Sequence, residues 1–485
     1  MQDKKKFYIN GEWIDSQNGQ PFSVLNPATE EKVATITLGT EDDVNNAVKS
    51  AREAFKSYSQ TSKEERIELI TKIQKAYEAR WMDLAQAVTA EMGAPSWLSA
   101  SAQVGMGWAH FPEALRVLQE YEFTEEMPRT TLLKTPVGVC GLITPWNWPL
   151  NQILCKVLPA LAVGCTVILK PSEIAPLNAM LLAEIMDAAE VPPGVFNLVN
   201  GDGVGVGTFL SKHPQVNMMS FTGSTRAGIL VAKNAAETVK RVSQELGGKS
   251  VNLILPDADL EAAVVHGVNS VMMNSGQTCA APTRMLVPKE LHEQACEIAK
   301  QVTEKTQVIA PTTPAEGDDN IESLLHSAMK IGPVVSAQQY EKIQGLIAKG
   351  IDEGAQLIAG GLGKPTGFEN GYFVKPTVFA AVDNSMTIAQ EEIFGPVLCI
   401  IPYSSVEEAI SIANDSNYGL SGYISAGTDA YAKEVAAKIE TGAIHINRSA
   451  PDFSAPFGGI KQSGNGREWG VFGFDEFIEL KALIA

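Results

Sequence analysis

Gly276-Gln277-Thr278-Cys279 is the stretch of sequence on which the interpretation of the whole chain depends. A helix-like run over residues 260–273 precedes it. A thiol just past a glycine, among small residues, can lie accessible on a turn, where its thiolate can attack an electrophilic carbon. Most free cysteines are instead small buried hydrophobic side chains. The role of Cys279 therefore depends on whether the chain also supplies a base, an oxyanion partner and a cofactor site.

The composition restricts the class of protein. The chain has 485 residues, which is too long for one ordinary domain and predicts two or three. Hydrophobic residues make up 45% and charged residues 19%, so large cores are expected and wholesale disorder is not. The formal net charge is −18 and the pI is about 4.9. Because an acidic surface repels phosphate backbones, nucleic acid is excluded as an expected partner, whereas a local pocket for one small anion is not.

Cysteine usage and the first residues indicate where the protein works. The six cysteines are scattered and form no CxxC pair, so we expect neither a zinc site nor a disulfide framework, and no bound metal. Residues 1–10 are basic but lack the apolar core of a signal peptide. The sequence contains no run of 18 apolar residues, so no membrane span is predicted. A soluble, reducing, cytoplasmic setting is therefore expected, without a membrane partner.

The order of expected elements indicates two α/β units. Short strands at 9–14 and 22–25 are followed by helices whose capping pairs are Thr40 with Asp43 and Ser62 with Glu65, the second helix ending near Gly93. Residues 121–137 are extended and form either a ribbon that pairs with another subunit or a plain surface hairpin. From residue 137, apolar strands alternate with helices, and a second such series runs from 252 to 446, which predicts doubly wound sheets. Residues 311–317 are the most linker-like.

Two stretches that end expected strands can hold a dinucleotide. Phe221-Thr222-Gly223-Ser224 follows a strand and begins a helix, where backbone amides and the Ser224 hydroxyl can bind a pyrophosphate; an ordinary tight turn is the alternative. Lys170-Pro171-Ser172-Glu173 lies at a strand end, which faces the ligand crevice in open α/β sheets. There Lys170 and Glu173 can contact ribose hydroxyls, unless they are simply solvated. A carboxylate would repel a 2′-phosphate and so favours NAD over NADP.

Three further stretches carry groups suited to catalysis. Pro145-Trp146-Asn147-Trp148-Pro149 places one amide between two aromatic side chains, where it can donate to an oxyanion. Glu245-Leu246-Gly247-Gly248-Lys249 combines a carboxylate with glycines that allow close approach; a carboxyl in a semi-apolar cleft has a raised pKa and can activate water. Glu391-Glu392-Ile393-Phe394-Gly395-Pro396 brings a carboxylate near an aromatic ring. A packed loop and a glutamate that caps a turn are the structural alternatives. The six histidines form no catalytic or metal-binding spacing, which argues against a Cys–His hydrolase.

Taken together, in this order and spacing, these stretches resemble the NAD(P)-dependent aldehyde dehydrogenase superfamily over residues 9–480. The resemblance implies an α/β fold with a Rossmann-type nucleotide-binding domain, an α/β catalytic domain and a β oligomerisation arm. The nucleotide-binding domain would comprise 1–120 and 138–247, and the catalytic domain 248–446. The arm and the C-terminal segment would comprise 121–137 and 447–485, and would assemble a homodimer or homotetramer.

The same resemblance implies a role for each motif. Cys279 would be the nucleophile, Glu245 the general base, and Asn147 the oxyanion-hole amide, together with the backbone N–H of Cys279. The residues expected to contact NAD (with NADP less favoured) are Lys170, Glu173, Gly223, Ser224, Trp146, Glu392 and Phe394. The residues expected to contact the aldehyde are Trp148, Gln152, Phe453 and Phe457, with Arg448 and Asp452 as further candidates.

The implied reaction oxidises an aldehyde to a carboxylic acid through a cysteine thiohemiacetal and a thioester, which water activated by Glu245 hydrolyses. An aromatic-walled tunnel suits aromatic or medium-chain aldehydes, whereas Gln152 and Arg448 suit the polar tail of a semialdehyde. Two alternative functions are disfavoured. The presence of Glu245 argues against a CoA-acylating enzyme, and the intact set of motifs argues against a non-catalytic structural protein. Residues 316–333 look longer, and 447–456 shorter, than in well-known members.

Overall fold

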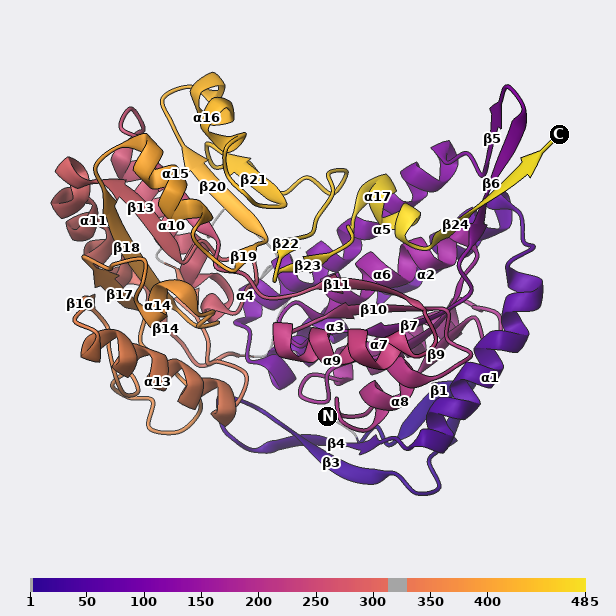
Figure 1. Cartoon of the computed structure of the whole chain (residues 1–485). Helices are drawn as coiled ribbons and strands as arrows, with labels where there is room; N and C mark the ends of the chain where they lie inside the picture. Colours follow the sequence, from indigo (N-terminus) through magenta and orange to yellow (C-terminus); the bar gives the residue numbers. More distant parts are fainter. Residues whose placement is uncertain (1–2, 313–328) are drawn as a thin grey trace.

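The computed structural model describes residues 3–312 and 329–485 (Figure 1). Most of the linker-like stretch 311–317 and of the long segment 316–333 lies outside these described residues. In the described part of the chain, no helix is both long and apolar enough to cross a membrane. The predicted α/β class is confirmed, because two large sheets are each flanked by helices on both faces (Figure 1).

The first sheet has a Rossmann-type core. Five central strands are parallel. The first of these five in the chain, β7, lies in the middle, with β8 and β9 on one side and β10 and β11 on the other. The carboxyl ends of β7 and β10 are therefore neighbours at the switch point where ligands bind in such sheets. In spatial order the strands are β2 (Glu12–Asp15), β1 (Lys6–Ile9), β9 (Phe196–Leu198), β8 (Thr166–Lys170), β7 (Val139–Ile143), β10 (Met218–Thr222), β11 (Arg241–Glu245) and β23 (Gly464–Asn465).

Both faces of this sheet are covered by helices. Strand β7 is buried throughout, and its side chains alternate between two apolar clusters, with Val139 and Ile143 in one and Cys140 and Leu142 in the other. The first cluster is completed by helices α1 (Glu41–Tyr58), α8 (Val206–Lys212) and α9 (Thr225–Ala236). The second is completed by α2 (Lys63–Ala79), α3 (Trp81–Met92), α5 (Val104–Glu120), α6 (Pro149–Val163) and α7 (Leu177–Ala188).

The second sheet has seven strands, of which β16 alone runs antiparallel to its neighbour. In spatial order they are β16 (Gln356–Ala359), β17 (Thr377–Ala380), β18 (Val397–Tyr403), β13 (Arg284–Pro288), β12 (Val251–Ile254), β20 (Ser421–Ser425) and β21 (Ala443–Ile446). One face packs on α10 (Leu260–Met272) and α11 (His292–Lys305). The other packs on α13 (Ala337–Asp352), α14 (Thr387–Gln390), α15 (Val406–Asn414) and α16 (Asp429–Ala436).

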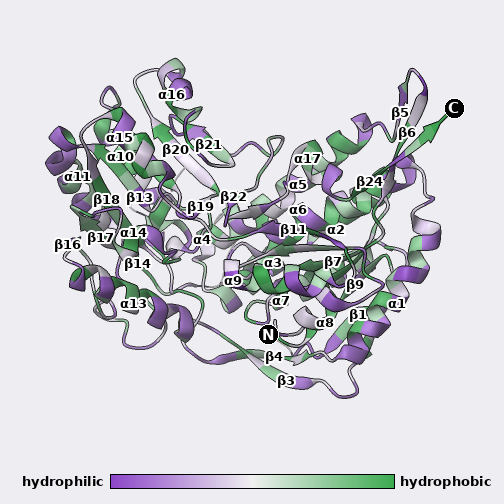
Figure 2. Ribbon diagram, in the orientation of Figure 1, coloured by the Kyte–Doolittle hydropathy of each residue, from purple (hydrophilic) through white to green (hydrophobic). Residues whose placement is uncertain are grey.

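A third, small sheet projects from the first unit. Strands β5 (Thr124–Met127) and β6 (Thr130–Pro136) form a hairpin, and the C-terminal strand β24 (Ile478–Ile484) pairs antiparallel with β6 (Figure 1). The plain surface hairpin is thus excluded in favour of a three-stranded ribbon. Three apolar side chains of β24 are exposed on this sheet: Leu480, Leu483 and Ile484. The strand is green, the colour of hydrophobic residues, in Figure 2. The expected division of the chain into three parts, with its boundaries, stays a prediction.

The helix boundaries bring one correction. Both capping pairs are confirmed, since Asp43 accepts the Thr40 N–H at 2.8 Å and Glu65 accepts the Ser62 N–H at 2.6 Å. The helix predicted from Ser62 to Gly93, however, is two helices, because Arg80 leaves the helical conformation (φ −113°, ψ 18°) between α2 and α3. The Arg80 side chain there pairs with Asp83 and Glu184, which stabilises the break.

Buried Arg284, at the start of β13, ties the second sheet to the segments around it. Its Nε donates to the Lys249 carbonyl at 3.0 Å, and its Nη1 to the Asn384 Oδ1 at 3.0 Å and the Ile412 carbonyl at 2.9 Å. Its Nη2 donates to the Ala413 carbonyl at 2.9 Å. One guanidinium therefore satisfies four acceptors that would otherwise be left without a donor.

Replacing Arg284 by methionine should lower the free energy of unfolding by about 3 kcal/mol or more, because these acceptors stay buried while their donor is removed. The readout is the midpoint of urea unfolding followed by circular dichroism. The same exchange at the exposed Arg226 is the matched control and should change stability by less than about 0.5 kcal/mol. Equal midpoints for the two variants would contradict this role of Arg284.

Candidate active site

A left-handed turn presents the Cys279 thiol. Helix α10 ends at Met272, and the next turn, η2 (Met273–Gly276), contains three consecutive residues with positive φ: Asn274 at 54°, Ser275 at 56° and Gly276 at 74°. A Cβ on Gly276 would lie 1.9 Å from the Gly395 carbonyl oxygen, so only glycine fits there. The turn reverses the chain and places Cys279 beyond the end of α10.

Hydrogen bonds join this turn to the loop between β7 and α6. The Nδ2 of buried Asn147 donates to the Gln277 carbonyl at 3.0 Å. The Asn147 carbonyl accepts from the Nδ2 of Asn274 at 2.8 Å and from the Nε2 of Gln103 at 3.0 Å. Since an amide nitrogen carries two hydrogens, Asn147 keeps a second N–H for a ligand. The sequence analysis missed Gln103 and Asn274, although the Asn-Ser-Gly run is a signal for left-handed backbone.

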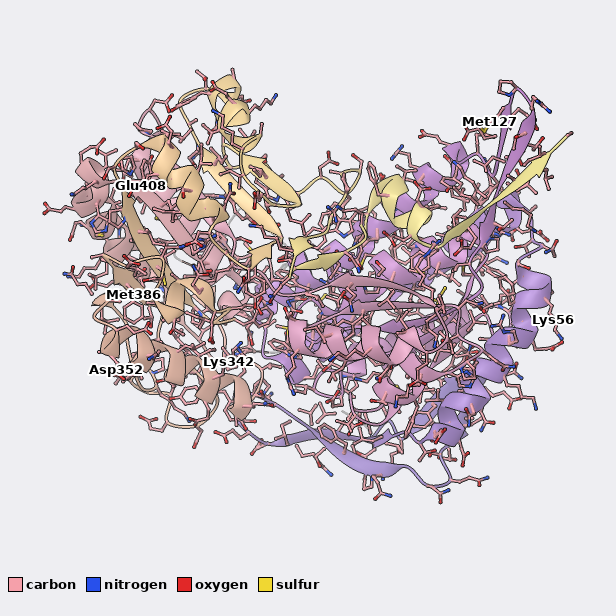
Figure 3. All side chains as sticks on the ribbon, viewed as in Figure 1. Lys56, Met127, Lys342, Asp352, Met386 and Glu408 are labelled. Carbon is pink, nitrogen blue, oxygen red and sulfur yellow. The ribbon has the colours of Figure 1, made fainter. Side chains whose placement is uncertain are left out.

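The thiol and this amide line one cavity of about 190 Å³ between the two sheets. Eight predicted site residues meet there: Cys279, Asn147, Trp146, Gln152, Gly223, Ser224, Glu392 and Phe394. Further lining residues that the sequence analysis did not single out include Thr222, Gln339 and Lys342. Lys342 lies on the side of α13 that faces the first unit (Figure 3). The cavity thus collects groups from the switch point of the first sheet and from the loops of the second.

The groups predicted to hold a cofactor have the following contacts. Ser224 is the N-cap of α9, and its Oγ accepts the Ala227 N–H at 3.3 Å, which leaves its own hydrogen free to donate. Glu392 accepts the Gly248 N–H at 2.9 Å, and burial raises its pKa. The Trp146 and Phe394 rings meet edge to face, 5.4 Å between centroids. Lys170 and Glu173 form an ion pair of 3.2 Å at the end of β8, outside the lining of the cavity.

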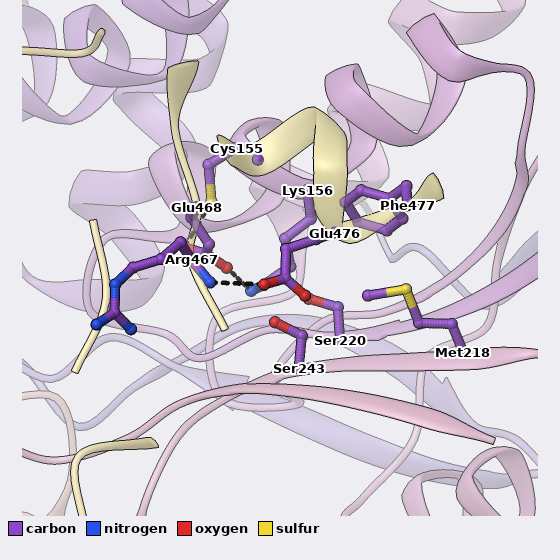
Figure 4. A pocket seen from close by; sticks show the side chains of 10 residues that line it. Cys155, Lys156, Met218, Ser220, Ser243, Arg467, Glu468, Glu476 and Phe477 are labelled. Atoms are coloured by element: carbon purple, nitrogen blue, oxygen red, sulfur yellow. Dashed lines mark hydrogen bonds and ion pairs between the residues drawn. The ribbon is translucent and has the colours of Figure 1, made fainter. Parts of the chain in front are cut away.

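A cluster of buried ionisable groups lies at the end of β11. Glu245 is 3% exposed, and both its carboxylate oxygens have no hydrogen-bond partner among the described residues. Burial first, and then the charge of Glu468, raise the pKa of Glu245 well above that of an exposed carboxyl. Glu468 in turn pairs with the buried Lys156 and accepts from the Cys155 thiol at 3.3 Å (Figure 4). A carboxyl held in this way keeps its proton at pH values at which an exposed carboxyl is ionised.

The loop after Glu245 packs directly on the thiol loop. A Cβ on Gly248 would lie 2.4 Å from the Cys279 carbonyl oxygen, so glycine is required for this contact. Burial, followed by the charges of Glu392 and Glu245, raises the pKa of Cys279 to about 12. Because only the thiolate is a strong nucleophile, Cys279 needs a base to accept its proton.

The predicted substrate residues do not form one surface. Phe453 and Phe457 both stack on the Trp469 ring, with centroid distances of 4.9 and 4.7 Å. Trp148 instead donates through Nε1 to the Thr278 Oγ1 at 2.9 Å and supports the thiol loop. Arg448 and Asp452 are exposed, and Asp452 is bonded to Ser454. Of these candidates only Gln152 lines the cavity. Within residues 3–312 and 329–485, no group of His, Cys, Asp and Glu could hold a metal ion.

Comparison with known proteins gives consistent relatives. Residues 13–483 match the sequence profile of the aldehyde dehydrogenase family. The chain is 54% identical over 485 residues to a 3-succinoylsemialdehyde-pyridine dehydrogenase of a Pseudomonas species, covering 100% of this chain and 99% of that one. It is similar to a crystal structure of an aldehyde dehydrogenase from Bartonella henselae, with a TM-score of 0.95, 46% identity and full coverage of both chains. It also resembles aldehyde dehydrogenase C from Pseudomonas syringae, solved with NAD+ and octanal, with a TM-score of 0.95, 46% identity and coverage of 99% and 96%.

Gly276→Ala should damage both stability and the position of the thiol. An alanine at this left-handed position would be strained and would collide with the Gly395 carbonyl, so we expect a loss of about 2 kcal/mol or more and slower alkylation of Cys279. Urea unfolding and peptide mass spectrometry after iodoacetamide treatment are the measurements. Gly345→Ala on α13, where a Cβ meets nothing within 4 Å, is the control and should neither lower the stability nor slow the alkylation. If both variants behaved alike, the turn would not position the thiol.

Proposed function

Because this chain belongs to the aldehyde dehydrogenase family, we propose that it oxidises an aldehyde to a carboxylic acid with NAD as hydride acceptor, using Cys279 as the nucleophile. The observation that supports this most strongly is the cavity in which the Cys279 thiol and the Asn147 amide meet. Glu245, whose carboxyl has no partner among the described residues, ends β11 directly before the loop that packs on Cys279. A nucleophile, an oxyanion donor and a base are the groups that acyl chemistry of this kind requires.

The residues present fit NAD. The start of α9 offers free backbone N–H groups and the Ser224 hydroxyl to a pyrophosphate, and the Thr222 Oγ1 beside it is buried without a partner among the described residues. The Glu392 carboxylate lines the same cavity and can accept hydrogen bonds from a ribose. Lys170 and Glu173 end the neighbouring strand, where the Glu173 carboxylate would disfavour a 2′-phosphate. When bound, NAD supplies the acceptor for the hydride that leaves the substrate carbon.

In the first half of the reaction, Glu245 accepts the Cys279 proton directly or through water, and the sulfur adds to the aldehyde carbon. The carbonyl oxygen becomes an oxyanion, which accepts the second N–H of Asn147 and the backbone N–H of Cys279. Hydrogen bonds from Gln103 and Asn274 hold the Asn147 backbone in place before the substrate arrives. Loss of hydride from the tetrahedral carbon leaves a thioester on Cys279.

In the second half, Glu245 first releases the Cys279 proton to solvent. Its carboxylate then removes a proton from water, and the resulting hydroxide attacks the thioester carbon. The oxyanion again accepts from Asn147, the carbon–sulfur bond breaks, and the acid leaves while Cys279 departs as the thiolate. Two steps through a covalent intermediate replace one difficult step. Retention of this base supports hydrolysis by water rather than transfer to a second thiol.

The substrate is proposed to be an aldehyde with an aromatic or medium-chain body. The Pseudomonas relative is named for a semialdehyde on a pyridine ring, and the Pseudomonas syringae structure contains octanal.

The exposed apolar residues of β24 support a further proposal, in which the three-stranded arm joins copies of this chain into a homodimer or homotetramer.

Replacing Cys279 by alanine should abolish NADH formation from octanal and NAD, because no other group in the cavity can form the thioester. Absorbance at the NADH band measures the rate. Cys296→Ala, which removes a thiol on α11 of the second unit, should leave the rate unchanged. Equal NADH formation by wild type and Cys279→Ala would rule out the proposed nucleophile.

The turnover rate should rise with pH and level off once Glu245 has lost its proton. Its raised pKa means that the carboxyl is protonated, and unable to accept a proton, below that value, so activity is gained as the pH increases through it. Glu245→Gln should reduce kcat by about 100-fold or more and remove this rise. Steady-state kcat between pH 5.5 and 9 provides the test; a variant that keeps the wild-type profile would assign the base to another group.

A further inference from the structure

We infer that Glu91 is a positioning residue for the cofactor: its carboxylate caps α7 and thereby fixes the loop that presents Glu173. The inference rests on the proposed contact of Glu173 with a ribose of NAD and adds a residue that acts through it. Glu91 lies in the last turn of α3 and is fully buried. It does not line the cavity that contains Cys279, so any contribution it makes to the reaction passes through the chain around it.

Three N–H groups donate to the Glu91 carboxylate. The backbone N–H of Leu177 donates to Oε2 at 2.5 Å, and that of Asn178 donates to Oε1 at 2.9 Å. The Asn178 side chain adds a third bond, from Nδ2 to Oε1 at 2.7 Å. Both backbone groups belong to the first turn of α7, where N–H groups have no partner within the helix. Glu91 thus caps α7 from a position 86 residues earlier in the chain.

The capped end of α7 holds the loop that follows β8. Asn178 Nδ2 donates not only to Glu91 but also to the Ala175 carbonyl at 2.8 Å. Glu173 lies two residues before Ala175, and its carboxylate pairs with Lys170, the last residue of β8, at 3.2 Å. A proline at each end of the loop restricts its backbone. Glu173 is therefore held on one side by β8 and on the other, through Asn178 and Ala175, by Glu91.

The need to cap α7 does not by itself explain a buried carboxylate. The N-cap of α7 is Pro176, which has no polar side chain, whereas serine or asparagine at that position would cap the helix without a buried charge. Burial raises the pKa of Glu91 to about 7 against the opposing effect of its hydrogen bonds from Asn178 and Leu177, so this carboxylate is costly to keep. The distant carboxylate adds a fixed link between α3 and the loop, which a local cap cannot provide.

The test measures the Kd of AMP by isothermal titration calorimetry at pH 8.5, where Glu91 is ionised. AMP contains the adenosine ribose, which carries the 2′-phosphate in NADP, but no nicotinamide. Glu91→Gln keeps the shape and turns an amide N–H toward a backbone donor, so the Kd should rise about fivefold or more. Asn178→Ala removes the link to Ala175 and should also raise the Kd. Glu304→Gln, the same exchange at an exposed residue of α11, is the matched control and should keep the wild-type Kd.

Two further readouts distinguish positioning from general damage to the fold. At saturating NAD, the kcat of Glu91→Gln with octanal should stay within about twofold of wild type, because the groups around Cys279 are unchanged. In a Glu173→Ala background, Glu91→Gln should no longer weaken AMP binding, since the contact that it positions is absent.

The outcomes separate the inference from the proposed function. An unchanged AMP affinity in either single variant, a parallel fall of kcat, or an equal further loss in the Glu173→Ala background would overturn the positioning role of Glu91. If Glu91→Gln does not fold, Asn178→Ala decides alone. An unchanged AMP affinity of Glu173→Ala would contradict the ribose contact on which the inference rests. Absence of NADH formation from octanal by wild type would instead contradict the proposed function.

Discussion

The hydrogen bonds between Asn147 and the 274–277 turn hold the catalytic groups of the two units together. Asn147 lies in the loop that follows β7 of the first sheet, whereas the turn lies between β12 and β13 of the second sheet. Because three left-handed residues and the contact of Gly276 with Gly395 fix the turn, the thiol has one position relative to the amide. In the proposed mechanism, the Asn147 donor is therefore held in place before a substrate binds, and such preorganisation is a main source of electrostatic catalysis.

The second feature of the site is a group of carboxyl side chains that lie close together. Glu245, Glu392 and Glu468 approach the same region, and the packing of strand ends and loops buries Glu245 and Glu468 and half-buries Glu392. Their proximity favours the protonated forms of Cys279 and Glu245, so the reaction can begin only by transfer of the thiol proton to a base. The ion pair of Lys156 with Glu468 offsets part of the negative charge and stabilises the cluster.

The sequence predicted the parts of the site that follow strand ends. Asn147 and Ser224 meet because β7 and β10 are parallel neighbours whose carboxyl ends lie at one edge. Cys279 and Glu392 reach the same cavity from segments that follow the helical elements η2 and α14 of the second unit. Local patterns could not predict Gln103 or the pairing of Lys156 with Glu468 across 312 residues, since these contacts exist only after the sheets have packed. The break at Arg80 was missed for a related reason: its partner Glu184 is distant in the chain, while local spacing continues the helix.

The central claim is that Cys279 carries the acyl group between hydride loss and hydrolysis. The most direct measurement is a peptide mass spectrum of the wild-type protein, mixed with octanal and NAD and quenched in acid within one turnover. The account predicts an octanoyl group on the peptide that contains Cys279, and its absence when NAD is omitted. An unmodified Cys279 together with NADH release, or an acyl group on another cysteine, would contradict it.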